Sequence, residues 1–196
     1  MNKKYFSYVL IIFILLTTAS FAQGLKFGFG GGLSTLSNSN SGLSYNAGYH
    51  LSAKAKIDIP LFPIRPVAFI QYYILNGSYS FPTPVGNING STTQKIFSAG
   101  IGAEYSLLPG PISPYLAVDF GYNNIGELKY ESAGLTLPSN PSYSRTGLDI
   151  GAGVEISVPF LISFDVSAKY NMLNLFGKQS GEGSISVFNL NLTVLF

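Results

Sequence analysis

The only histidine of this 196-residue chain stands two residues before a serine, in the sequence His50-Leu51-Ser52. An imidazole beside a hydroxyl is the arrangement by which proteins activate a serine nucleophile, because the histidine can take its proton. Residues two apart on a β-strand point to the same face. The pair could therefore perform acyl transfer, provided that this segment is a strand and that its polar face meets a substrate.

The residues around this pair alternate in polarity, which predicts a β-strand rather than a helix. From position 44 to position 59, every odd residue is apolar or aromatic, and every even residue is polar, charged or glycine. His50 and Ser52 therefore share one face with Lys54, Lys56 and Asp58. Such a strand needs an apolar environment on one side and a polar one on the other.

The same alternation recurs along most of the chain, and no segment after the first 22 residues is apolar for the 18 consecutive positions that a spanning helix needs. We expect eight strands, at roughly 25–36, 43–59, 65–79, 93–107, 114–127, 144–158, 161–174 and 184–196. In lipid, only helices and closed barrels satisfy every backbone polar group. The sequence therefore predicts an all-β fold, an eight-stranded antiparallel up-and-down transmembrane β-barrel.

A soluble barrel such as a lipocalin is the alternative, because its strands alternate too. It would bury the apolar face and expose the polar one, so alternation alone does not separate the two folds. The composition does favour lipid contact: only 10% of the residues are charged, whereas 15 are Phe and 13 are Tyr.

The first 22 residues have the three parts of a secretory signal peptide: Lys3 and Lys4, an apolar run over 9–16, and small residues before Ala22. Because a retained membrane anchor would need roughly 20 apolar residues, we expect cleavage after Ala22. The predicted organisation is a signal peptide at 1–22 and one outer-membrane β-barrel domain at 23–196.

The charge balance gives no support for nucleic-acid binding. Removing Lys3 and Lys4 from the 11 basic residues leaves nine, which equals the nine acidic ones. With no cysteine and one histidine, the chain also lacks the side chains of thiolate or His-cluster metal sites. We expect neither a metal nor a cofactor.

The last strand carries an apolar residue at every second position up to the final aromatic. Its members on that face are Phe188, Leu190, Leu192, Val194 and Phe196. This pattern resembles the C-terminal assembly signal of bacterial outer-membrane barrels. The resemblance implies that the barrel assembly machinery is a partner during insertion.

Across residues 23–196 the chain resembles the OmpA/OmpX-type small outer-membrane barrels, including the OmpA-like proteins of Bacteroidetes-type bacteria. The likeness rests on the architecture and the terminal signal. It implies a bacterial outer-membrane location in contact with lipid, and roles in envelope integrity, adhesion or interaction with the surroundings.

The connections between the expected strands alternate in length. Those at 60–63, 109–111 and 159 are short and contain proline, whereas four others are longer and rich in Ser, Asn and Gly. Short turns of such barrels face the periplasm, so we expect both termini there. The long loops 80–92 and 128–143 are where we expect a surface ligand to bind, and we expect a monomer.

The alternation along the strands, which we call parity, places twelve charged residues at inward positions, six of each sign. They are Lys26, Lys54, Lys56, Asp58, Arg65, Glu104, Asp119, Arg145, Asp149, Glu155, Asp165 and Lys169. Eight strands enclose an interior just wide enough to be filled by side chains, and charges confined there must be paired. We therefore predict a non-enzymatic barrel with a filled lumen and a structural or surface-interaction role. A narrow channel or transporter for small or hydrophobic solutes is the alternative, although it would favour an excess of one charge sign.

Turn geometry predicts specific pairs. A four-residue turn at 60–63 sets Asp58 opposite Arg65, and the same register sets Ser52 opposite Gln71 and His50 opposite Tyr73. In the hairpin around Pro159, pairing 157 with 161 would set Asp149 opposite Lys169, and a two-residue slip would remove that match.

A His-x-Ser element followed by a Glu also occurs in lipid A deacylases, which are small outer-membrane barrels. The likeness implies a lipid-modifying enzyme as a second alternative. Here the pair faces the lumen, away from lipid, and Phe62 stands at about the position of the Glu. We therefore expect no catalytic residues.

Overall fold

The structure is a computed structural model that describes residues 24–39, 44–83, 86–127, 129–132, 135–137, 141–158 and 162–196. Its strands are β1 (Leu25–Asn38), β2 (Ser44–Tyr45), β3 (Ala47–Ile57), β4 (Ile64–Thr83), β5 (Gly86–Ser106), β6 (Ile112–Ile125), β7 (Lys129–Ser132), β8 (Leu135–Leu137), β9 (Tyr143–Ser157), β10 (Ser163–Phe176) and β11 (Ile185–Leu195). The predicted signal peptide, 1–22, lies outside the described residues. In the part of the chain that is described, no helix is long and apolar enough to cross a membrane.

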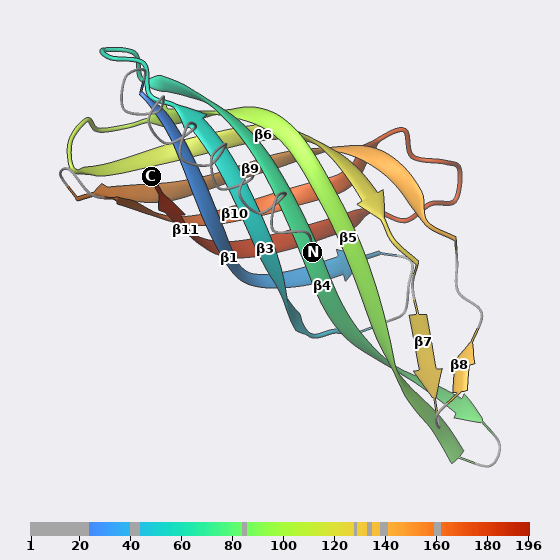
Figure 1. Cartoon of the computed structure of the whole chain (residues 1–196). Coiled ribbons are helices and arrows are strands. Elements are labelled where there is room, and N and C mark those ends of the chain that lie inside the picture. The colour runs from blue at the N-terminus through green and yellow to red at the C-terminus, as the bar shows by residue number, and fades with distance from the viewer. Residues whose placement is uncertain are drawn as a thin grey trace, which may run out of the picture.

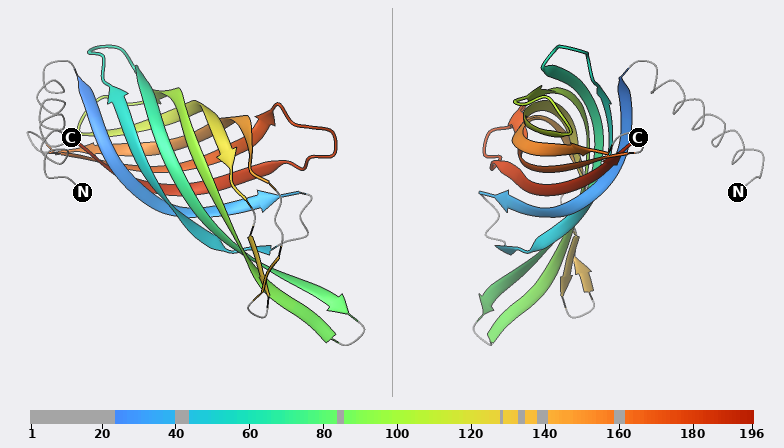
Figure 2. Two further views of the ribbon diagram at one scale, coloured as in Figure 1. Left: turned by 45° about the vertical axis from the view of Figure 1, so that its right-hand side comes forward. Right: turned by 90° about the vertical axis from the view of Figure 1, so that its left-hand side faces the viewer.

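Eight of these strands close into one barrel (Figure 1). Antiparallel pairing runs round the ring in the order β1, β3, β4, β5, β6, β9, β10 and β11, and β11 pairs with β1. At this seam Phe196 N donates to Phe27 O (2.7 Å), and Phe27 N donates to Phe196 O (3.2 Å). The predicted eight-stranded antiparallel barrel is confirmed, and its curved wall is clear in the right-hand view of Figure 2.

The alternating residues of each strand point to opposite faces of the barrel wall, one outside and one inside. On β11, Phe188, Leu190 and Leu192 are exposed on the outer wall, whereas Asn189 and Thr193 are buried inside. The outer face is apolar on the other strands too, with Leu51, Ile101 and Phe120 among its exposed side chains. An apolar exterior over a polar interior is the arrangement of a membrane barrel and the inverse of a lipocalin.

The two ends of the barrel differ. The terminal end carries the start of β1 and the end of β11, together with the short connections at 58–63 and 107–111. At the opposite end, β4 and β5 remain paired as far as Thr83 and Gly86, well beyond the other strands (Figures 1 and 2). We call residues 76–83 and 86–94 the ribbon, and this side of the barrel the ribbon end.

The prediction of a loop at 80–92 was wrong, because residues 80–83 and 86–92 belong to β4 and β5. Its Ser, Thr and Asn residues resemble a loop in composition, but a hairpin satisfies its backbone groups whatever the polarity of the side chains. The predicted loop at 128–143 contains β7 and β8, and β7 pairs with β5 at Ser91–Thr93. Secondary structure in both segments comes from pairing with a neighbouring strand, which a single-segment pattern does not show.

Candidate functional site: the barrel interior

The centre of the lumen is an ionic network around two lysines of β3. Lys54 Nζ lies 2.5 Å from Glu104 Oε1 and 2.8 Å from Asp165 Oδ2. Lys56 donates to Glu104 Oε2 (3.2 Å) and to Glu155, and its side chain is completely buried. The predicted lumen pairing of charges is thus present between strands that are far apart in sequence.

An aromatic ring organises this network. The Tyr115 ring lies 5.4 Å from Lys54 Nζ and 5.3 Å from the Arg65 guanidinium, and its hydroxyl donates to Asp165 Oδ1 (2.7 Å). Gly153 faces the ring, and a Cβ at that position would lie only 2.5 Å from the tyrosine hydroxyl. The inward glycine therefore makes room for a long side chain opposite, as a glycine on a crowded strand face does.

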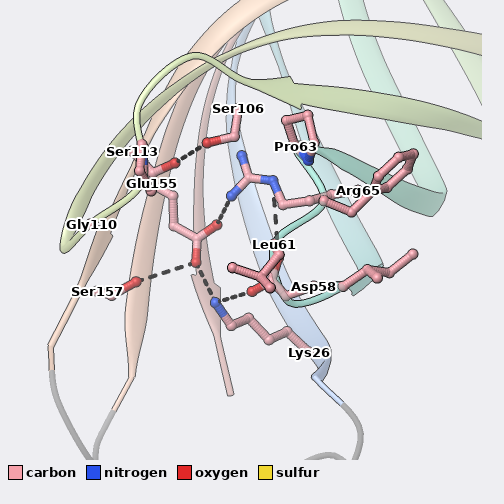
Figure 3. A pocket seen from close by; sticks show the side chains of 13 residues that line it. Lys26, Asp58, Leu61, Pro63, Arg65, Ser106, Gly110, Ser113, Glu155 and Ser157 are labelled. Carbon is pink, nitrogen blue, oxygen red and sulfur yellow. Dashed lines mark hydrogen bonds and ion pairs between the residues drawn. The ribbon is translucent and has the colours of Figure 1, made fainter.

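At the terminal end the network opens into a cavity of about 450 Å³ (Figure 3). Lys26 Nζ lies 2.5 Å from Asp58 Oδ2 and 2.6 Å from Glu155 Oε1. Arg65 Nη1 donates to Glu155 Oε2 (3.1 Å), and its Nε lies 3.9 Å from Asp58 Oδ1. Ser106, Ser113 and Ser157 also line the cavity, so paired charges and hydroxyls lie there beside apolar side chains such as those of Leu61 and Phe62.

The register predicted for the hairpin of β3 and β4 is confirmed. Tyr73 is the partner of His50, and Gln71 is the partner of Ser52. The same register brings Asp58 and Arg65 together in the cavity at the terminal end, where the two side chains are 3.9 Å apart. This register could be predicted because the four-residue turn at 60–63 fixes the offset between the two strands, which alternation alone does not.

The predicted pair of Asp149 and Lys169 is wrong. β9 and β10 pair Asp149 with Asn171, a slip of two residues from the expected register. Lys169 instead reaches Asp119 Oδ2 on β6, at 2.5 Å. The slip preserves which face each residue occupies, so the polarity pattern could not detect it.

Asp149 is consequently a buried carboxylate beside another carboxylate. Its register partner on β6 is Asp119, and both side chains are at least 96% buried. Among the described residues, Asp149 Oδ1 has no hydrogen-bond partner. A like charge opposite a buried carboxylate destabilises the fold.

Replacing Asp149 by asparagine is therefore expected to raise the free energy of unfolding, by about 1–2 kcal/mol. The measurement is urea unfolding in detergent micelles followed by far-UV circular dichroism, because the chain has no tryptophan. Asp165→Asn is the matched control and should destabilise, since Asp165 accepts from Lys54 and Tyr115. Equal losses in the two variants would show that Asp149 is as well paired as Asp165.

Arg145 pairs outside the lumen network, contrary to the prediction. Its guanidinium binds Glu182 in the connection between β10 and β11, with Nη2 2.7 Å from Oε2 and Nε 3.1 Å from Oε1. Asn174 Nδ2 also donates to Glu182 (2.9 Å). Glu182 was missed because it follows a glycine in a segment without alternation, and nothing there marks it as the partner of a strand residue.

This contact predicts a pH dependence for the loop at 177–184. Partial burial opposes ionisation, but the hydrogen bonds from Arg145 and Asn174 lower the pKa of Glu182 from 4.5 to about 2. A carboxyl group with a lowered pKa stabilises the fold above its unfolded value and loses that contribution as the pH falls through its folded value. The Gln179 amide, which donates to Glu182 Oε2 (3.0 Å), should thus keep its hydrogen-exchange protection at pH 4 and lose it near pH 2. Loss of protection between pH 4 and 5 would contradict this assignment.

The ribbon end of the lumen is closed by an apolar plug that the sequence did not predict. Its members are buried residues at inward positions, with at most 4% of their surface exposed: Leu36, Tyr73, Leu75, Ile96, Ile125, Leu173, Ile185 and Val187. Around Tyr73 and Leu75 apolar residues occupy both faces of β4, so alternation does not distinguish inside from outside there. Leu36, Ile125 and Ile185 are apolar at inward positions, where the alternation predicts polar residues. The lumen is therefore ionic toward the terminal end and apolar toward the ribbon end.

Between these layers lies His50, whose geometry is that of a packed polar residue. Its Nε2 donates to Asn191 Oδ1 (3.0 Å), and its Nδ1 lies 2.7 Å from Ser34 Oγ. Ser52 Oγ donates to the same Asn191 oxygen (3.1 Å), so the serine proton is directed to an amide instead of the imidazole. His50 is 99% buried, and this arrangement does not form a nucleophile and base facing a substrate.

The middle of the described lumen holds a much smaller void than the cavity at the terminal end. Near the middle, a void of about 20 Å³ lies among Ser52, Gln71, Lys169 and Asn189, enough for about one water molecule. Within the described residues, no group of three or more His, Asp or Glu side chains could hold a metal ion.

Comparison with known proteins agrees with this architecture. No curated protein matches the chain. Among solved structures, Neisserial surface protein A has 20% sequence identity and a TM-score of 0.62, covering 88% of this chain and 96% of its own. OprG from Pseudomonas aeruginosa has 10% identity and a TM-score of 0.55, covering 89% and 97%. A major outer membrane protein from Thermus thermophilus has 13% identity and a TM-score of 0.53, covering 88% and 98%.

These likenesses concern the fold, whereas the family follows from the sequence. Residues 8–196 match the family model of the outer membrane protein beta-barrel domain. Together with the closed eight-stranded barrel and its apolar outer wall, this match assigns the chain to the bacterial outer membrane. The chain belongs to the outer membrane protein beta-barrel domain family.

Proposed function

We propose that this protein is a non-conducting, non-enzymatic outer-membrane barrel with a structural or surface-interaction role. The observation that carries the proposal is the filled lumen, in which an ionic network and an apolar plug follow one another along the axis. An ion crossing the plug would leave water for an apolar environment, which is strongly unfavourable. The charges of the ionic layer are mostly paired with one another and do not form a ring of one sign, as the lining of a selective pore would.

Single-channel recording in planar bilayers tests this proposal. The purified, refolded barrel is expected to give no conductance steps above those of a protein-free bilayer, because the plug leaves no continuous aqueous path. The refolded fraction is monitored on a gel by comparing heated and unheated samples. Stable steps from fully folded protein would support the alternative of a narrow conduit and overturn the proposal.

We further propose that the ribbon end faces the outside of the cell and that both termini lie in the periplasm. Short connections at the terminal end and a long ribbon at the other support this orientation, because such barrels have short periplasmic turns and longer external loops. The chain contains no cysteine, so single introduced cysteines report their own location. Ser91→Cys in the ribbon should react with a membrane-impermeant maleimide on intact cells, whereas Leu108→Cys should react only after permeabilisation. The opposite labelling pattern would reverse the orientation.

The surface role is proposed to reside in the ribbon. Residues 76–94 include no charged side chain and are rich in Ser, Thr, Asn and Gly. A partner of this surface would bind by hydrogen bonds and van der Waals contact, so its affinity should depend weakly on ionic strength. Adhesion of cells that display the barrel, compared with cells that display a version lacking residues 79–90, tests this role at low and high salt. Equal adhesion by the two strains would remove the ribbon as the interaction surface.

A further inference from the structure

The outer wall of the barrel has an apolar groove, of about 670 Å³, across β1, β11, β10, β9 and β6. Its floor is formed by small outward residues that lie between larger ones. Ala168 and Ala152 are register partners on β10 and β9, and Gly31 on β1 pairs with Leu192 on β11. The groove is thus built by side-chain size at positions that the alternation assigns to the lipid-facing side.

Large side chains form the walls of the groove. Leu190 is the register partner of Ala168 on one side, and Leu116 is the partner of Ala152 on the other. Both leucines are half-exposed, as is Leu33 beyond Leu190. A linear apolar molecule in the groove would therefore contact the barrel on its floor and on both flanks.

The register places the groove in one leaflet. Val154, Val166 and Leu192 lie three residues from the ends of their strands at the terminal end, and Ala152, Ala168 and Leu190 lie five residues from them. With about 3.3 Å per residue and a strand tilt of about 40°, these rows lie roughly 8 and 13 Å from that end along the barrel axis. The apolar band of such a barrel is about 25 Å tall, so the groove occupies the half that belongs to the terminal end.

The surroundings of the groove determine what fills it. Its lining is overwhelmingly apolar, and the polar residues among it, such as Ser167 and Asn191, occupy inward positions on their strands. A polar molecule in the groove would lose the hydrogen bonds that its polar groups make in water. A hydrocarbon chain has no such groups and therefore has no such cost. We propose that the groove seats one acyl chain of a phospholipid from the leaflet at the terminal end. Naming this leaflet the periplasmic one rests on the proposed orientation, whereas the binding itself does not.

Native mass spectrometry after detergent extraction tests the proposal, with phosphatidylethanolamine as the added lipid. The unmodified barrel is expected to retain one phospholipid per chain. The double variant Ala152→Leu with Ala168→Leu fills the groove and should reduce retention at least tenfold. The matched control is Ala99→Leu with Ala103→Leu, which adds the same atoms at outward positions of β5, outside the groove, and should retain lipid as the unmodified barrel does.

Heat-modifiable gel mobility shows that each variant is folded, and the milder Ala168→Val replaces the double variant if that one fails to fold. Retention that is equal in the groove and control variants, or absent from the unmodified barrel, would overturn the proposal. A dimer of the unmodified barrel that dissociates when the groove is filled would also overturn it, because a second copy would then be the occupant. A conducting barrel would defeat the proposed function and leave this lipid measurement unchanged.

Discussion

Replacing Lys56 by methionine is expected to lower the free energy of unfolding by about 3–5 kcal/mol. Lys56 is completely buried and binds Glu104 and Glu155 from two other strands. Methionine fills similar space but carries no charge, so Glu104 and Glu155 would each lose one positive partner. Removing one member of a buried pair costs more than the pair contributes, because the remaining charge stays in a poorly solvated site.

Urea unfolding in detergent micelles, followed by far-UV circular dichroism, measures this loss. Lys95→Met is the control: Lys95 is exposed on β5, and its replacement should change the stability by less than about 0.5 kcal/mol. The double variant Lys56→Met with Glu104→Gln removes one charge of each sign and should recover part of the loss. A single variant as stable as the control would mean that the network around Lys56 is hydrated and not a desolvated core.

Replacing Leu75 by alanine should lower the free energy of unfolding by about 2–5 kcal/mol, although this residue lies inside a membrane barrel and not in the core of a soluble protein. Leu75 is completely buried in the apolar plug, where it packs in one cluster with Ile96 and Leu173. The strands around the plug are held by their hydrogen bonds and cannot close the space that the leucine leaves. The cost is therefore that of a cavity in addition to the lost contacts.

Leu51→Ala is the control for the plug, because Leu51 is 65% exposed on the outer wall. The detergent chains around the barrel can move into the space left there, so the expected loss is less than about 1.5 kcal/mol under the same conditions. If Leu51→Ala costs as much as Leu75→Ala, the plug behaves as a loosely packed surface and the filled lumen loses its support.

Several features of the barrel could be predicted because they depend on parity. The alternation of β3 and β11 placed Lys54 and Lys56 inside and Leu190 and Leu192 outside, and the structure agrees. The register of β3 with β4 also followed, because the length of the turn at 60–63 fixes which residues of the two strands lie opposite each other. The assembly role of Phe196 stays a prediction.

Other features could not be predicted, because they depend on partners distant in sequence. A two-residue slip between β9 and β10 preserves parity, so Asp149 and Lys169 were paired wrongly without any conflict in the pattern. Arg145 keeps its predicted inward parity at the ribbon end, yet its partner is Glu182 in a loop, which no strand periodicity could indicate. The composition of the ribbon is typical of a loop. Its strands form because β4 pairs with β5, and composition does not indicate that pairing.

The sequence by itself determined the class of this protein: parity, an even number of strands and an aromatic, charge-poor composition leave a closed barrel in a membrane as the fold that satisfies the backbone. The tertiary structure alone decided how the lumen is filled and which charges meet. Lys56 reaches Glu104 and Glu155, and Leu75 reaches Leu173, only after the sheet has closed. The physical reason is that parity is a local property of a strand, whereas ion pairs and packing depend on register and on the curvature of the whole sheet.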